Sequence, residues 1–142
     1  EKQDINDDTR LRASIYFKNF IKKYWATDAL SNKDINKIKD IIFKIMVCAQ
    51  PKAQSQLSQA ISIIAEKDFF KNWEQLLPEI IDYIENTKQQ MNQNECALGI
   101  IDSITHKYIG KRKDYKMVEE IKYILKLFGK IWLKKLQEWG QP

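Results

Sequence analysis

Apolar residues recur at helical spacing along nearly the whole chain, and this pattern restricts the fold more than any other feature of the sequence. Six blocks carry it, at about 8–25, at 31–50, from 51 onward, after 68, after the polar run at 86–94, and at about 114–139. With only 4 Gly and 3 Pro, the 142 residues contain few helix breakers. We therefore predict an all-α fold of six helices.

Each block has one apolar face, which we predict to be buried. In the first three blocks this face holds Ala13, Phe17, Phe20, Ile21, Tyr24; Ile35, Ile38, Ile41, Ile42, Ile45, Met46; and Ala53, Leu57, Ala60, Ile61, Ile64. In the last three it holds Trp73, Leu76, Leu77, Ile80, Ile81, Ile84; Ala97, Ile101, Ile104, Tyr108; and Val118, Ile121, Leu125, Phe128, Trp132, Leu136. Trp25, Phe43 and Trp139 also fall at helical spacing and are expected in the core, with packing on a further repeat as the alternative for Trp139.

Local signals predict where some helices begin. Ser31 followed by Asp34 indicates a helix N-terminus, and Pro51 suits the first turn of the third helix. Pro78 lies inside the fourth block, so that helix either begins late, near Leu76, or is kinked at the proline.

The second, fourth and sixth blocks begin near Asn32, Lys71 and Asp114, roughly 40 residues apart. Helix pairs that repeat at about 40–47 residues are typical of HEAT and armadillo arrays. The alternative is a compact helical bundle with irregular loops. In an array, each helix pair packs on its neighbours. Because no apolar helix precedes the first block, we interpret 1–142 as a single fragment of a longer solenoid that starts at the second helix of a pair. The predicted fragment is an α-α superhelix of about three HEAT-like repeats.

Composition narrows the function without deciding it. The net charge of +5 is small and spread along the chain, so it does not identify a nucleic-acid, membrane or acidic protein partner. No apolar run is long enough to span a membrane, and the polar, acidic start does not resemble a signal peptide. Cys48 and Cys96 lack metal-ligand spacing and sit in apolar patterns, which predicts buried thiols that form no disulfide.

Catalytic motifs are absent from the sequence, so we predict a protein that is not an enzyme and uses no cofactor or metal. His106 is the one histidine and lacks partners for a metal site. Lysines at 122, 126, 130 and 134 form a stripe, and 111–113 form a basic turn. A solvated helix face is the favoured interpretation of both, over an acidic partner or a nucleic-acid backbone.

Three segments resemble the importin-beta superfamily. They are RLRASIYFKNFIKKYW at 10–25, QSQLSQAISIIAEKDF at 54–69 with Trp73 and LLPEII after it, and EIKYILKLF at 120–128. The second segment is the most specific and is similar to the branch of CAS-type exportins. Phe70 replaces the proline that this branch usually has after Asp-Phe, and the long leading helix and later repeats of the family are missing from 1–142.

This resemblance implies a function that the pattern alone does not. CAS-type exportins bind importin-alpha together with the GTP form of the GTPase Ran, cross the nuclear pore, and release both in the cytoplasm. The expected partners are therefore Ran-GTP and importin-alpha, with nuclear pore proteins also compatible, and the expected location is the nucleus and cytoplasm. No nucleic acid or membrane span is expected.

The second helix of each pair usually lines the concave surface of a solenoid, so the candidate partner-binding residues lie opposite the core in the first, third and fifth blocks. They are Ile15, Asn19, Lys22; Ser55, Gln59, Ser62, Glu66; and Ser103, His106. A solvated face is the simpler interpretation of any one of them. Three other functions remain open: an importin-beta-type import receptor, a HEAT scaffold unrelated to transport, and a basic helical nucleic-acid binder.

Overall fold

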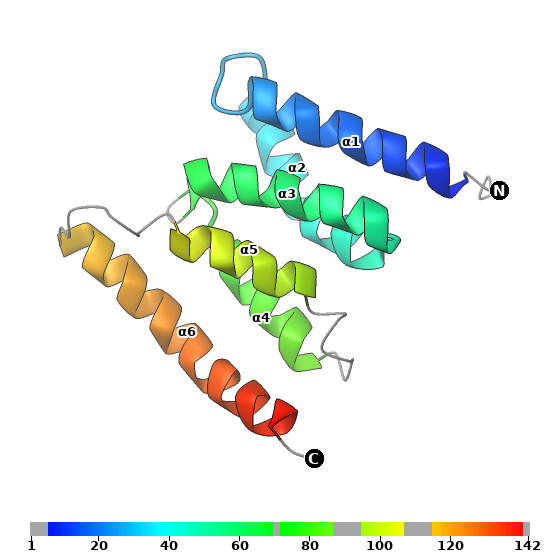
Figure 1. The fold of residues 1–142 in the computed structure, drawn as a ribbon. Coiled ribbons are helices and arrows are strands. Elements are labelled where there is room, and N and C mark those ends of the chain that lie inside the picture. The colour runs from blue at the N-terminus through cyan, green and yellow to red at the C-terminus, as the bar shows by residue number, and fades with distance from the viewer. Residues whose placement is uncertain (1–5, 70–71, 87–94, 107–114, 141–142) are drawn as a thin grey trace. The chain divides into compact units, whose positions relative to one another are not determined.

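The computed structural model describes residues 6–69, 72–86, 95–106 and 115–140, and these contain helices and no strand. The helices are α1 (Asp7–Tyr24), α2 (Asn32–Cys48), α3 (Pro51–Asp68), α4 (Leu76–Asn86), α5 (Glu95–His106) and α6 (Tyr115–Trp139), shown in Figure 1. The predicted all-α fold with six helices is confirmed. Tyr108, the basic turn at 111–113 and the side chains of Lys130, Trp132 and Trp139 lie outside what the structure describes.

The helix starts follow from local capping. The side chain of Asn6 accepts a hydrogen bond from the Thr9 amide at 2.8 Å at the start of α1. Ser31 accepts one from the Asp34 amide at 3.2 Å, which confirms the cap predicted for α2. Helix α4 begins at Leu76, so Pro78 falls in its first turn, where no intrahelical amide bond is lost.

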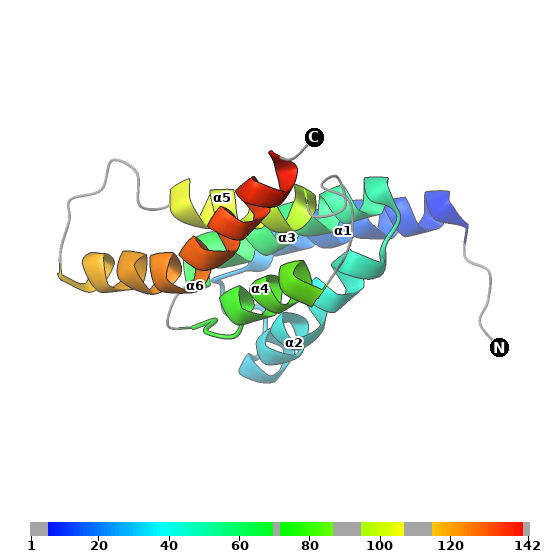
Figure 2. The same ribbon diagram turned by 90° about the horizontal axis from the view of Figure 1, so that it is seen from below.

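The chain divides into two compact units, residues 1–69 and 70–142. In the first unit α1 and α2 both pack on α3, and Figures 1 and 2 show α1 and α3 lying side by side. The turn between α2 and α3 is only two residues long, so these helices form an antiparallel pair. The buried apolar residues of this unit are Ile21, Trp25, Ile42, Phe43, Met46, Ala53, Leu57, Ala60, Ile61, Ile64, Ala65 and Phe69.

The second unit contains α4, α5 and α6, with contacts between α4 and α6. Its buried apolar residues are Trp73, Leu76, Leu77, Ile80, Ile84, Ala97, Ile100, Ile101, Ile104, Met117, Ile124 and Phe128. The core predicted for α4 is largely confirmed, with Ile81 half-buried. In α5 the buried set also includes Ile100, which adjoins the predicted Ala97, Ile101 and Ile104.

Several predicted core residues of the first unit are exposed instead. These are Ala13 and Phe20 of α1 and Ile41 and Ile45 of α2, with Ile45 48% exposed. The physical reason is that α1 and α2 each use another face to pack on α3, which leaves these side chains without a covering helix. Phe17, Tyr24, Ile35 and Ile38 are half-buried for the same reason.

Ala13, Ile41 and Ile45 line an open apolar groove, which we call the α1–α2 groove. Two adjoining cavities of about 790 and 240 Å³ make up this groove. Ala13, Ser14, Ile41, Ile45 and Leu57 line both cavities. Cys48 lines the larger one and is exposed, so the prediction that it is buried is wrong; Cys96 is half-buried, and neither cysteine is in a disulfide.

The predicted core face of α6 is also displaced. Leu125 and Leu136 are 63% and 55% exposed, whereas Met117, Ile124 and Phe128 are buried. The buried positions follow the spacing i, i+7, i+11, and the predicted Val118 and Ile121 flank them half-buried. Apolar residues occupy a wide part of the α6 surface. The described residues bury only the side with Met117, Ile124 and Phe128 and leave Leu125 and Leu136 exposed.

Candidate partner-binding face

The three candidate residues of α1 lie away from the core, as predicted. Asn19 and Lys22 are exposed and Ile15 is half-buried. Neither Asn19 nor Lys22 makes a hydrogen bond or ion pair with another residue that the structure describes. Both polar groups are therefore available to a partner, beside an apolar side chain.

The candidate residues of α3 show the same division. Ser55, Gln59 and Glu66 are exposed, and Ser62 is half-buried. The Ser62 hydroxyl donates to the Ser58 carbonyl at 3.0 Å, so its hydrogen is used within the helix. Gln59 and Glu66 have no partner among the described residues, which leaves one neutral and one anionic group facing solvent.

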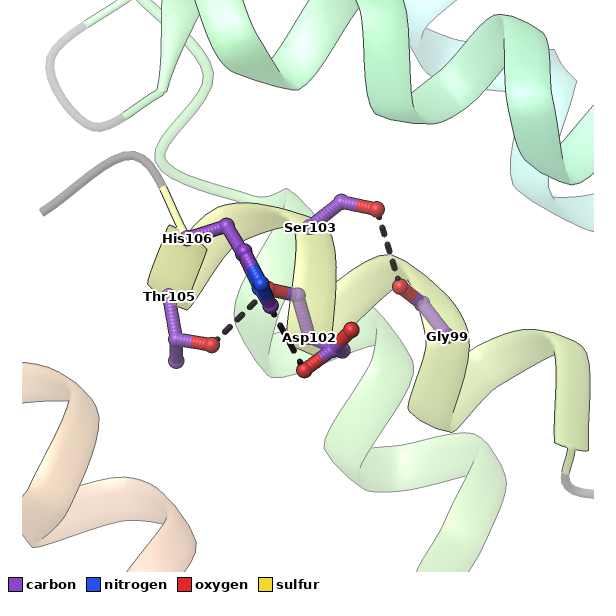
Figure 3. A network of polar contacts seen from close by, with 5 residues as sticks. All are labelled: Gly99, Asp102, Ser103, Thr105 and His106. Carbon is purple, nitrogen blue, oxygen red and sulfur yellow. Dashed lines mark hydrogen bonds and ion pairs between the residues drawn. The ribbon is translucent and has the colours of Figure 1, made fainter. Parts of the chain in front are cut away.

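In α5 the candidates belong to a local polar network (Figure 3). The Ser103 hydroxyl donates to the Gly99 carbonyl at 3.0 Å, and Thr105 donates to the Asp102 carbonyl at 2.8 Å. His106 Nδ1 lies 3.0 Å from the Asp102 carbonyl and 3.5 Å from its carboxylate Oδ1. Because the His106 and Asp102 side chains are well exposed, solvent weakens the interaction between them. All contacts of the network lie within α5, on its solvent-exposed surface.

The structure brings two of the three sets together. Helices α1 and α3 pack on each other within the first unit, so their candidate residues lie on neighbouring helices. Helix α5 belongs to the second unit, so its candidate residues are on neither of these two helices nor in their unit. The binding role of all nine residues stays a prediction.

Sequence reasoning missed a polar cluster that joins the helices carrying this face. Asp68 Oδ2 lies 2.7 Å from Lys39 Nζ and 3.2 Å from Trp25 Nε1, and we call these three residues the Asp68 cluster. Lys39 occupies a position on the inner face of α2, four residues before the buried Phe43. A lysine on the apolar face of a helix indicates a paired charge, and this signal points to Lys39 but not to its two partners.

Neither a candidate metal site nor a membrane-spanning helix is present among the described residues. They contain no group of three or more His, Cys, Asp or Glu side chains placed to hold a metal ion. None of the described helices combines the length and apolar character needed to cross a membrane. The exposed polar groups and the α1–α2 groove are suited to protein contacts, in which a few apolar anchors sit among polar groups.

A family model matches part of the chain, and similar proteins match most of it. Residues 1–48 match the model of the importin-beta N-terminal domain. Exportin-2 of Drosophila melanogaster is 32% identical over 137 residues, which are 92% of this chain and 14% of that protein. The importin-alpha re-exporter of Schizosaccharomyces pombe is 34% identical over 130 residues, 88% of this chain and 13% of the relative.

A solved structure agrees with the sequence comparisons. The exportin Cse1 in its cargo-free, cytoplasmic state superposes with a TM-score of 0.79 and 28% identity, over 96% of this chain and 15% of that one. This match confirms the predicted fold class, a fragment of a HEAT-repeat solenoid. The chain spans about one seventh of the length of the proteins it matches.

Proposed function

Because this chain is a homologue of a segment of the exportin-2 proteins, the importin-alpha re-exporters, we propose that it is part of a nuclear transport receptor. That receptor binds Ran in its GTP form and carries importin-alpha from the nucleus to the cytoplasm. The observation that supports this most is the agreement of sequence and backbone over nearly the whole chain, at 34% identity to a re-exporter and a TM-score of 0.79 to an exportin.

The proposed contribution of 1–142 is protein binding. Exposed Asn19 and Lys22 on α1 and Gln59 and Glu66 on α3 offer hydrogen-bond donors, acceptors and both signs of charge, on helices that pack on each other. Shape and charge complementarity on such a face set specificity and the rate of association. No catalytic step is part of the proposal, and the protein would move between nucleus and cytoplasm.

A second candidate is an import receptor of the importin-beta family. The match of residues 1–48 to the importin-beta N-terminal domain supports it, because that domain is not named for export. The two candidates differ in how Ran-GTP affects cargo: an exportin holds cargo more tightly when Ran-GTP is bound, and an import receptor releases it.

A pull-down tests the proposal with the longest natural polypeptide that contains this chain. Ran-GTP and Ran-GDP are compared as added components, and captured importin-alpha is measured. Capture of importin-alpha with Ran-GTP and not with Ran-GDP is the expected result. Capture that Ran-GTP abolishes would favour the import receptor, and indifference to both forms would overturn both candidates.

The same assay on 1–142 alone has a different expected outcome. A chain that spans about one seventh of the matched receptors presents only a fraction of their binding surface. We expect binding of Ran-GTP at least 100-fold weaker than by the long form. Equal affinity would place the whole Ran site within these 142 residues.

A further inference from the structure

One carboxylate joins all three helices of the first unit. Trp25 is the C-terminal cap of α1, Lys39 lies in α2, and Asp68 is the last residue of α3. Asp68 Oδ2 pairs with Lys39 Nζ at 2.7 Å and accepts a hydrogen bond from Trp25 Nε1 at 3.2 Å. The Lys39 ammonium also lies 5.9 Å from the centre of the Trp25 ring, so each member contacts both others.

Lys39 and Trp25 are buried and Asp68 is half-buried, which affects how much the cluster contributes to stability. The side chains of Lys39 and Asp68 are 6% and 17% exposed, and Trp25 is 3% exposed. A buried ion pair adds little net stability over apolar side chains of similar size, because both charges lose their hydration. Its hydrogen bonds, however, weaken steeply with distance and angle, whereas apolar packing tolerates small shifts. A polar cluster of this kind therefore restricts the relative orientation of the helices it joins more than it raises the free energy of unfolding.

A separate feature restricts the same end of α1. Ala26, directly after Trp25, has a φ of 68°, a left-handed backbone conformation that residues other than glycine rarely adopt. The Thr27 hydroxyl donates to the Tyr24 carbonyl at 2.6 Å, and the Ala29 amide donates to the Thr27 hydroxyl at 3.2 Å. The chain thus leaves α1 through one defined turn while the indole of Trp25 is held by Asp68.

We infer that Asp68 is a positioning residue: it fixes the direction of α1 relative to the α2–α3 pair. Lys22 and Glu66 lie within one helical turn of Trp25 and Asp68, so the cluster also affects where these two candidate binding residues lie. This effect on partner binding rests on the proposed function. The cluster thereby sets the spacing between the candidate binding residues of α1 and those of α3. At the opposite end of α1, the α1–α2 groove leaves the helix without a comparable polar contact among the residues described there.

Measuring the direction of α1 tests this inference without any partner. Arg12 on α1 and Lys52 on α3 are exposed, and Arg12 is about 20 Å along the helix from Trp25, so a small rotation becomes a measurable displacement. Spin labels are attached at Arg12→Cys and Lys52→Cys in a Cys48→Ser, Cys96→Ser background. Electron–electron distance distributions are then recorded together with the Tm.

The decisive variant is Lys39→Met with Asp68→Leu, which removes both charges and retains side-chain volume. We expect its Tm to stay within about 5 °C of the parent, while the distance distribution broadens or shifts. An unchanged distribution would overturn the inference. A Tm loss of about 10 °C or more with an unchanged distribution would overturn it too, because the cluster would then be a stabilising contact alone.

Trp25→Phe provides a second test should the double variant fail to fold. It keeps an aromatic ring and the Lys39–Asp68 pair but removes the indole N–H and part of the ring volume, so a broadened distribution with a loss of Tm is expected. Glu119→Gln is the matched control: it removes the exposed Lys122–Glu119 pair at 3.6 Å and should change neither quantity. Trp25→Phe with the parent distribution would count against the role of the Asp68 hydrogen bond.

The link to binding is tested last, in the long polypeptide. If the parent binds Ran-GTP, the double variant should bind about tenfold more weakly. Equal binding despite a changed distance would overturn the link between helix direction and recognition. If the parent does not bind Ran, the proposed function fails, and the distance measurements still decide whether Asp68 positions α1.

Discussion

The two ends of α1 differ in how they are held. At its C-terminal end, Trp25 is buried and bonded to Asp68, which also pairs with Lys39. Toward its N-terminal end, Ala13 faces an open apolar groove lined by Ile41 and Ile45 of α2. The comparison shows that apolar side chains alone do not make a closed interface, and that polar contacts can fix one end of a helix whose other end is uncovered.

The largest expected contrast in stability comes from the Asp68 cluster at the C-terminal end of α1. Lys39→Ala leaves the half-buried Asp68 carboxylate without its ammonium partner, so we expect a loss of about 3 kcal/mol in the free energy of unfolding. Lys44→Ala, at an exposed position of the same helix, should change it by less than about 0.5 kcal/mol. Urea unfolding followed by circular dichroism measures both. Equal losses would mean that the Asp68 cluster is not the stronger contact of α2.

A smaller contrast concerns apolar side chains. Ile64→Ala removes a fully buried side chain one turn from Asp68 and should cost about 2–5 kcal/mol. Ile41→Ala, at the groove, should cost about 1 kcal/mol or less, because 43% of Ile41 is already exposed. The same unfolding experiment compares them. A loss at Ile41 as large as at Ile64 would show that the groove is closed in solution.

Backbone strain predicts a modest gain in stability. Ala26→Gly relieves a left-handed conformation that costs an L-residue about 1–2 kcal/mol, against an entropic cost of about 0.5–1 kcal/mol for glycine in the unfolded chain. We expect a net gain of up to about 1 kcal/mol. Ala13→Gly is the control within helix α1 and should lose about 1 kcal/mol. Thermal unfolding distinguishes the two, and a loss at Ala26 would contradict the strained turn.

The smallest effect is kinetic and leaves stability unchanged. Cys48 is exposed at the groove and should react with a thiol reagent several-fold faster than the half-buried Cys96. Cys48→Ser and Cys96→Ser variants assign the two phases of the reaction. Slow labelling of Cys48 would indicate that something covers the groove, as a dimer would, and gel filtration would then test for a second copy.

Sequence periodicity predicted the helices well because amphipathic spacing and the cap at Ser31 are local features. It also selected the apolar positions, including Ile41, Ile45 and Leu125. It could not show which of these positions a neighbouring helix covers, because burial depends on a partner that the pattern of one helix does not contain. The errors therefore gather at the α1–α2 groove and on the outer face of α6.

The candidate site was predictable to a lesser degree. Helical spacing placed Asn19, Lys22, Gln59 and Glu66 away from the core, and the structure agrees. The Asp68 cluster was not predicted because its members are 14 to 43 residues apart, and only the fold brings an indole, an ammonium and a carboxylate together. The resemblance nevertheless included Trp25 and Asp68 among its matching residues.

The two-residue turn between α2 and α3 also has a consequence for folding order. Contacts near this turn close short loops, such as the hydrogen bond that Gln54 donates to the Met46 carbonyl, 8 residues away. The hydrogen bond between Trp25 and Asp68 joins residues 43 apart. Local contacts generally form early, so we expect the α2–α3 hairpin to assemble first and α1 to dock onto it afterwards. On unfolding we expect the reverse order of events. Helix α1 would detach before the α2–α3 hairpin opens, starting at its groove end, and breaking the Trp25–Asp68 hydrogen bond would complete its release.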